Sequence, residues 1–229
     1  MSRSLITVRE VAAGLHVSAR EVVRMADEGI LPAVRVKGAW HFRAGEIWNW
    51  IEANLQVLPS QRARDPHPAQ PGDPLLAPVL NTSAISVSLK AKTKASVIRE
   101  LAALAERFDS TLDVQALVEA VTEREAQGST ALQDGVAVPH PARPFYSEGP
   151  IIAAARTAQG VIFGERGGGL TDLFFLVCCP QQVEHLLYLG RLCRLLIDKK
   201  LQIRLRSAAD ANSFADALRE AEAALCKSA

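Results

Sequence analysis

Two short segments in the first 55 residues place apolar side chains at helical spacing, within 7–14 and 18–29. Each begins with a hydroxyl residue followed three positions later by a glutamate, the pattern of a capping box at a helix start. Residues 33–43 then alternate apolar and basic side chains around a glycine, which predicts a hairpin, and 46–54 present an apolar helical face. Helix, tight turn, helix and hairpin in this order predict a winged helix-turn-helix unit.

Apolar periodicity is lost between residues 56 and 78, where six prolines interrupt a polar stretch. Proline density favours extended polyproline II, so about 20 residues at ~3.1 Å each could separate the flanking units by up to about 60 Å. We therefore expect a helix-turn-helix domain over 1–55, a Pro-rich linker over 56–78 and a larger domain over 79–229.

Past the linker, amphipathic helical patterns alternate with short apolar runs typical of buried strands. The predicted helices are 94–108, 114–124, 185–197 and 212–226, and the predicted strands are 136–138, 151–155 and 173–177. Strands that alternate with helices, in too few units for a barrel, favour an α/β sandwich with a central mixed sheet flanked by helices.

Composition adds few constraints. The chain has 229 residues, 48% of them hydrophobic, and a formal net charge of +1, so any surface for nucleic acid must be local. No apolar run reaches the ~18 residues of a membrane span and no secretory signal pattern opens the chain, so we expect a cytoplasmic protein without membrane insertion. The four cysteines lack the paired spacing of a zinc site. We expect reduced buried thiols, with no metal and no organic cofactor.

The N-terminal pattern, with Leu5–Ala12, Gly29–Val36 and Trp40–Arg43 as its most characteristic segments, resembles the excisionase-like, MerR-type winged helix-turn-helix domains over nearly all of residues 1–55. The resemblance implies DNA binding through a recognition helix and a wing, with these residues in contact: Ser18, Arg20, Arg24, Arg35, Lys37 and Arg43. Seven basic residues face six acidic ones in this unit, so a winged helix used for protein contact remains the alternative. Specific DNA binding by so small a unit would need a homodimer on paired half-sites.

His140 ends a short apolar run and lies between Pro139 and Pro141. This placement predicts an imidazole presented at a strand end, where loops converge, and open to a docking partner. A neutral histidine keeps one nucleophilic ring nitrogen while a backbone carbonyl can fix the other. Pro141 removes one backbone N–H that an active-site loop could otherwise use.

Residues 75–225 resemble the enzyme IIA domains of the fructose, mannitol and nitrogen-regulatory branch of the bacterial phosphotransferase system, on the Pro-His motif at 139–140 and the Arg-Glu-x-x-Gly-Ser-Thr stretch that begins at Arg124. The resemblance implies that His140 is the phosphoacceptor and that Arg124 and His185 stabilise the phosphoryl group. A guanidinium can bind phosphoryl oxygens bidentately, and a second imidazole can donate to one of them. Ser129 and Thr130 could add further donors to the phosphate.

Three functions follow from these two resemblances. The leading hypothesis is a DNA-binding regulator whose larger domain is reversibly phosphorylated on His140 by a histidine-containing phosphocarrier protein. The second is a phosphotransferase component that relays the group to a sugar permease, and the third is a protein-binding module that is not phosphorylated. The chain carries no recognisable permease-type domain, which favours regulation over sugar transport.

Overall fold

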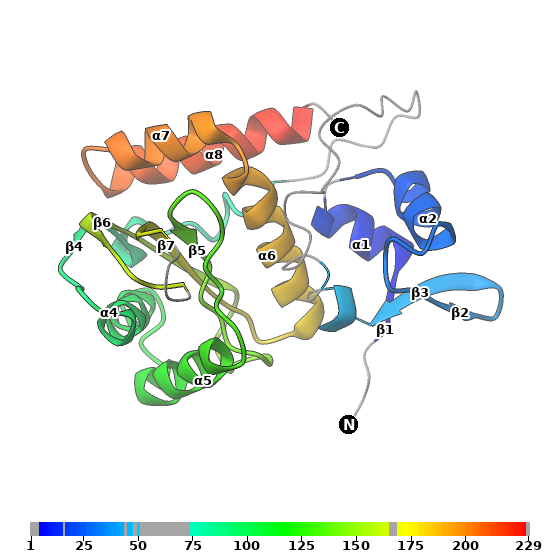
Figure 1. The fold of residues 1–229 in the computed structure, drawn as a ribbon, viewed down its shortest axis with the longest axis horizontal. Coiled ribbons are helices and arrows are strands. Elements are labelled where there is room, and N and C mark those ends of the chain that lie inside the picture. Colours follow the sequence, from blue (N-terminus) through cyan, green and yellow to red (C-terminus); the bar gives the residue numbers. More distant parts are fainter. Residues whose placement is uncertain are drawn as a thin grey trace.

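The computed structural model describes residues 5–15, 17–43, 45–47, 50, 74–164 and 169–227. Figure 1 shows a small N-terminal unit beside a larger one in which helices surround a sheet. This confirms the predicted fold class, a mixed α/β protein with a helix-turn-helix region and a mixed sheet flanked by helices. Residues 56–73 of the predicted linker lie outside the described residues. The small unit, the described part of residues 5–50, is called the head below.

The elements of the head that the structure describes in full are two helices and a three-stranded antiparallel sheet. Its elements are β1 (Leu5–Thr7), α1 (Val8–Leu15), α2 (Ala19–Asp27), β2 (Val34–Val36) and β3 (Ala39–Arg43), with β3 in the centre of the sheet. The predicted caps are confirmed: the N–H of Thr7 donates to Glu10 at 2.7 Å, and the Ser18 Oγ accepts from the N–H of Glu21 at 3.1 Å.

The predicted hairpin is present and turns at Lys37 and Gly38, whose φ angles are 50° and 84°. Two consecutive residues with positive φ suit a two-residue type I′ turn, and glycine takes such a φ without steric cost. The helix predicted over 46–54 is described only at 46–47 and 50, which are helical.

The larger unit carries a four-stranded mixed sheet in the order β4-β6-β7-β5. Central strands β6 and β7 are antiparallel, and each has a parallel outer neighbour. The strands are β4 (Ile85–Leu89), β5 (Val136–Ala137), β6 (Ile151–Val161) and β7 (Thr171–Cys178). The helices are η1 (Thr82–Ala84), α4 (Lys94–Glu106), α5 (Val114–Ala126), α6 (Gln182–Leu196), α7 (Lys199–Ser207) and α8 (Ala211–Lys227).

Two apolar cores lie on opposite faces of this sheet, because successive strand residues point to opposite sides. In β6, Ile151 and Ala153 pack with α4 and α5, whereas Ile152 and Ala154 pack with α6, α7 and α8. In Figure 1, α4 and α5 lie on one side of the sheet and α7 with α8 on the other. Burial on both faces explains why these strands read as continuous apolar runs.

The head packs directly on the larger unit. Helix α1 lies against α6, and Figure 1 shows the two side by side. Leu186 of α6 belongs to the apolar cluster of the head, together with Ile6, Val11 and Leu15, and is 4% exposed. The two units are therefore joined by a hydrophobic contact.

The end of the predicted linker is fixed on the larger unit by a buried carboxylate. Glu222 of α8 accepts the backbone N–H groups of Leu75, Leu76 and Ala77 at 2.8 to 3.0 Å. It also pairs with Arg191 at 3.0 Å, and both side chains are almost completely buried. This carboxylate therefore has a donor for each of its oxygens, as a buried charge requires.

Candidate functional site

His140 follows β5, and backbone contacts fix its position. Its Nδ1 lies 2.8 Å from the carbonyl oxygen of Val138. A carbonyl only accepts, so Nδ1 carries the proton and Nε2 of the neutral ring keeps its lone pair. The carbonyl of Pro139 accepts from the N–H of Val177 on β7, which ties the segment to the central sheet.

Arg124 and His185, the two residues predicted to assist His140, come from different helices and lie beside it. His185 is in the first turn of α6, and its ring centroid is 5.4 Å from that of His140, with 54° between the ring planes. Arg124 is in the last turn of α5, is 8% exposed, and donates from Nη1 to the carbonyl of Gly128 at 2.9 Å. The structure thus brings together one guanidinium and two imidazoles from three parts of the chain.

Burial and nearby positive charge keep both imidazoles neutral. Burial lowers the pKa of His140 well below its usual range, and the nearby His185 and Arg124 lower it further. Burial and the charge of Arg124 lower the pKa of His185 to about 4. At neutral pH the site therefore holds one fixed positive charge, a nucleophilic nitrogen and a second neutral ring. This combination suits a phosphoryl group.

The prediction that His140 lies open to a partner is wrong for this structure, because its side chain is only 1% exposed. The ring lies against His185 of α6, and α6 is in turn covered by α1 of the head. Sequence patterns within the larger unit carry no information about a surface that another unit of the chain covers. The three side chains of the site are in place, but a protein partner cannot reach His140 in this conformation.

Ser129 and Thr130, predicted as phosphate donors, are engaged elsewhere. The N–H and hydroxyl of Thr130 both donate to Glu125, whose other oxygen pairs with Lys94 at 3.0 Å. The Ser129 hydroxyl donates weakly to the carbonyl of Phe163 and accepts from the N–H of Ala131 at 3.2 Å. Sequence reasoning missed the role of Glu125, which holds this loop; its signal was a carboxylate five residues before a threonine at a helix end.

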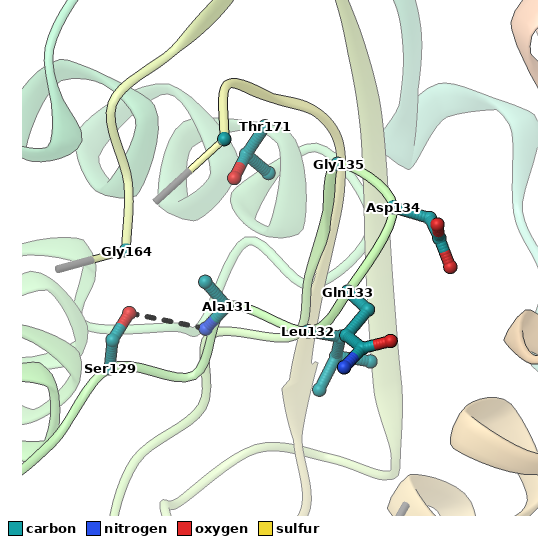
Figure 2. A pocket seen from close by; sticks show the side chains of 9 residues that line it. Ser129, Ala131, Leu132, Gln133, Asp134, Gly135, Gly164 and Thr171 are labelled. Atoms are coloured by element: carbon teal, nitrogen blue, oxygen red, sulfur yellow. Dashed lines mark hydrogen bonds between the residues drawn. The ribbon is translucent and has the colours of Figure 1, made fainter. Parts of the chain in front are cut away.

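A solvent-accessible pocket of about 590 Å³ is lined by Ser129 of this loop and by residues 131–135, which follow it. Figure 2 shows its lining, in which the side chain of Ser129 bonds to the Ala131 backbone, and Gln133 and Asp134 extend outward. His140, Arg124 and His185 do not line it. The pocket is therefore distinct from the histidine site.

In the head, the predicted DNA-contacting arginines are mostly paired with carboxylates of the head itself. Three arginines form four such ion pairs: Arg24 with Glu21 at 2.5 Å and Glu28 at 2.7 Å, Arg35 with Asp27 at 3.5 Å, and Arg43 with Glu46 at 2.8 Å. The guanidinium of Arg35 also stacks over the Trp40 ring at 4.6 Å. Except for Glu21, which is 12% exposed, these side chains are exposed, so phosphates could replace the other carboxylates at small cost.

The other three predicted contacts have different surroundings. Ser18 is the N-cap of α2. Arg20 is exposed in the first turn of the same helix, and Lys37 is exposed at the tip of the hairpin. All six residues lie on the predicted helix and wing, although the contacts of the arginines reduce the local positive charge.

Neither a metal site nor a membrane span is evident in the described part of the chain. No group of three or more histidine, cysteine or acidic side chains there could hold a metal ion. No helix among the described residues is long and apolar enough to cross a bilayer.

Comparison with known proteins gives matches for both units. Residues 78–221 match the family described as "Phosphoenolpyruvate-dependent sugar phosphotransferase system, EIIA 2", and residues 5–55 match a helix-turn-helix domain family. A nitrogen regulatory protein of Bradyrhizobium diazoefficiens is 34% identical over 133 residues, which cover 57% of this chain and 86% of that protein.

Two further relatives agree with these matches. The fructose-specific EIIABC component of Bacillus subtilis is 28% identical over 144 residues, 62% of this chain but only 22% of that much longer protein. The crystal structure of nitrogen regulatory protein IIA-Ntr from Neisseria meningitidis has a TM-score of 0.57 at 29% identity, and the match covers 63% of this chain and 99% of that one.

Proposed function

This chain belongs to the EIIA type 2 family of the phosphoenolpyruvate-dependent sugar phosphotransferase system and also carries a helix-turn-helix domain, and on that basis we propose that it is a phosphorylation-controlled DNA-binding regulator. Its larger unit accepts a phosphoryl group on His140 from a histidine-containing phosphocarrier protein. The observation that carries the proposal is the convergence of Arg124 and His185 on a histidine whose Nδ1 is fixed by a carbonyl.

The transfer needs only these side chains and the phosphodonor. The lone pair on Nε2 of His140 forms the new N–P bond, while the electron pair of the donor's N–P bond returns to the donor ring. That ring leaves as neutral imidazole when its other nitrogen carries a proton. The Nδ1 proton of His140 stays on its bond to Val138. Arg124 and His185 then stabilise the charge on the phosphoryl oxygens.

Burial of His140 favours a second candidate function, a protein-binding module that is never phosphorylated. A ring that is 1% exposed cannot meet a protein-borne phosphorus in this conformation. The two candidates differ in one observable, the appearance of an acid-labile phosphoryl group. A relay to a sugar permease would show the label and would also pass it on to an acceptor domain.

The test is incubation of the full chain with the general phosphotransferase proteins and labelled phosphoenolpyruvate. We expect acid-labile label in the wild type and none in His140→Gln, with His41→Gln of the exposed hairpin as the control that labels normally. Absence of label in the wild type and also in a variant whose head cannot dock on α6 would exclude both phosphorylated functions. Equal labelling of His140→Gln would refute the site.

Arg124 provides a sharper test of the site geometry. Arg124→Lys keeps the positive charge but removes the planar fork that binds two oxygens, so we expect labelling to slow by roughly 10- to 100-fold. Arg99→Lys, an exposed position on α4, should label at the wild-type rate. Wild-type labelling of Arg124→Lys would show that this guanidinium does not act on the phosphoryl group.

A further inference from the structure

The head covers the helix that carries His185. Leu186, the next residue along α6, packs into the apolar cluster of the head, while the ring of His185 contacts His140. Successive residues of an α-helix project about 100° apart, so one helix can present His185 to the site and Leu186 to the head. The residue that contacts His140 and the residue that contacts the head are therefore consecutive on α6.

The docked arrangement is incompatible with transfer from a protein donor. An attacking nitrogen must come within ~3–3.5 Å of phosphorus, in line with the bond that breaks. The side chain of His140 is 1% exposed, so no donor histidine can place its phosphoryl group there. Access requires a displacement, and the remainder of α6 is held by the core of the larger unit through residues such as Leu189 and Leu192. The head is the part that can leave without unfolding the larger unit.

We propose that docking of the head on α6 and phosphorylation of His140 are mutually exclusive. The docked head holds His140 in an unreactive state, and phosphorylated His140 keeps the head away from α6. This inference rests on the proposed phosphorylation of His140. It adds that the docking surface for the phosphodonor is the surface that the head covers.

Charge explains the reverse direction of the coupling. Phosphorylation adds about two negative charges to a site in which the guanidinium of Arg124 provides positive charge beside a neutral His185. If the head docked at Leu186, the excess negative charge of the phosphoryl group would be removed from water, and this desolvation has a high cost. The released head stays attached through the Pro-rich stretch, whose sequence predicts an extended tether.

The chain contains its own probe of docking. All three tryptophans, Trp40, Trp48 and Trp50, are in the first 55 residues, so tryptophan anisotropy decay reports rotation of the head alone. We expect slow rotation with the whole molecule in the unphosphorylated wild type. After labelling, a faster component should appear. Slow rotation that persists in fully phosphorylated protein would overturn the proposal.

Leu186 provides the variants that separate docking from folding. Leu186→Ala removes apolar contact with the head, and Leu186→Glu adds a charge that opposes docking. Leu195→Ala is the matched control, since it makes the same change on the same helix but faces the core of the larger unit. Labelling uses phosphoramidate, a small phosphoryl donor that needs no docking surface. We expect labelling of His140 to accelerate roughly tenfold in Leu186→Ala, more in Leu186→Glu, and not in Leu195→Ala.

Each outcome decides one question. If the head rotates freely in both Leu186 variants while they label at the wild-type rate, docking does not control access and this proposal fails, whereas the proposed function stands. Acceleration in Leu195→Ala equal to that in Leu186→Ala would assign the effect to a loosened fold and also refute it. If no protein takes label even with a released head, the proposed function itself fails. Exchange of the C2 proton of His140 would then show whether the ring had become accessible.

Discussion

The head and the interior of the larger unit hold their charges in opposite ways. In the head, Arg24, Arg35 and Arg43 pair with carboxylates on the surface, where water already solvates both partners. In the larger unit, Arg191 and Glu222 pair in the interior, with exposed fractions of 4% and 0%. Surface pairs are weak and exchangeable, whereas a buried pair is costly to break. The head can therefore exchange partners, while the larger unit is built to keep its arrangement.

The largest effect should come from the buried pair. Glu222→Gln leaves Arg191 without its counter-charge and weakens the bonds to Leu75, Leu76 and Ala77, so we expect a loss of about 3–5 kcal/mol in the free energy of unfolding. Glu220, two residues before Glu222, forms an exposed pair with Arg204. Glu220→Gln breaks that pair and should change the free energy of unfolding little. Urea denaturation followed by far-UV circular dichroism measures both. Equal effects would remove the distinction between the two kinds of pair.

The second largest effect should be the pH dependence of the free energy of unfolding, which the two neutral histidines cause. The folded-state pKa of His185 is lowered to about 4 and that of His140 also lies well below 6.5, so between pH 6.5 and 4 the unfolded chain binds protons that the folded chain does not. The contribution of these two neutral rings to the free energy of unfolding is fully present above pH 6.5 and is lost as pH falls. From pH 7 to 5 we expect a loss of roughly 1–2 kcal/mol per histidine. The double variant His140→Gln/His185→Gln should show a shallower pH dependence, and an unchanged slope would contradict the burial of these rings.

The smallest effect should be in DNA binding by the head. Glu21→Gln removes one of the two carboxylates that hold Arg24. The guanidinium, which keeps its pair with Glu28, then exchanges more readily onto a phosphate, and the salt dependence steepens by up to about one counterion. We expect affinity for duplex DNA to rise roughly three- to tenfold at low salt. Glu119→Gln changes the net charge equally but lies on α5 of the larger unit, so it should leave binding unchanged. If both variants bind alike, the head does not use Arg24 on DNA.

Most of the architecture could be predicted because local signals agree with it. Hydroxyl-to-glutamate spacing marked the starts of α1 and α2, and continuous apolar runs marked β6 and β7, which are buried on both faces. The family resemblance singled out His140, Arg124 and His185, which the fold places together. Such signals lie within a few residues of the elements they mark, so a single sequence is enough to identify them without knowledge of tertiary contacts.

Some elements were missed in the prediction, for different reasons. Strand β4 reads Ile-Ser-Val-Ser-Leu, an alternation that favours a half-buried strand, so its signal was present but unused. Helix α7 is strongly basic, with the isolated apolar residues Leu201, Ile203 and Leu205, and its pattern is weak. Strand β1 has three residues and exists only because β3 pairs with it. The contact between the head and α6 joins segments more than a hundred residues apart in the sequence, and periodicity along one segment cannot show which distant surface meets it.

Glu222 has a further mechanical consequence. By holding three consecutive backbone N–H groups, it anchors the chain at Leu75–Ala77, so any pull exerted through the tether ends on α8 and does not reach the sheet or the histidine cluster. Shortening or lengthening the chain before Pro74 would then tune how often the head returns to α6. The phosphoacceptor geometry would stay unchanged.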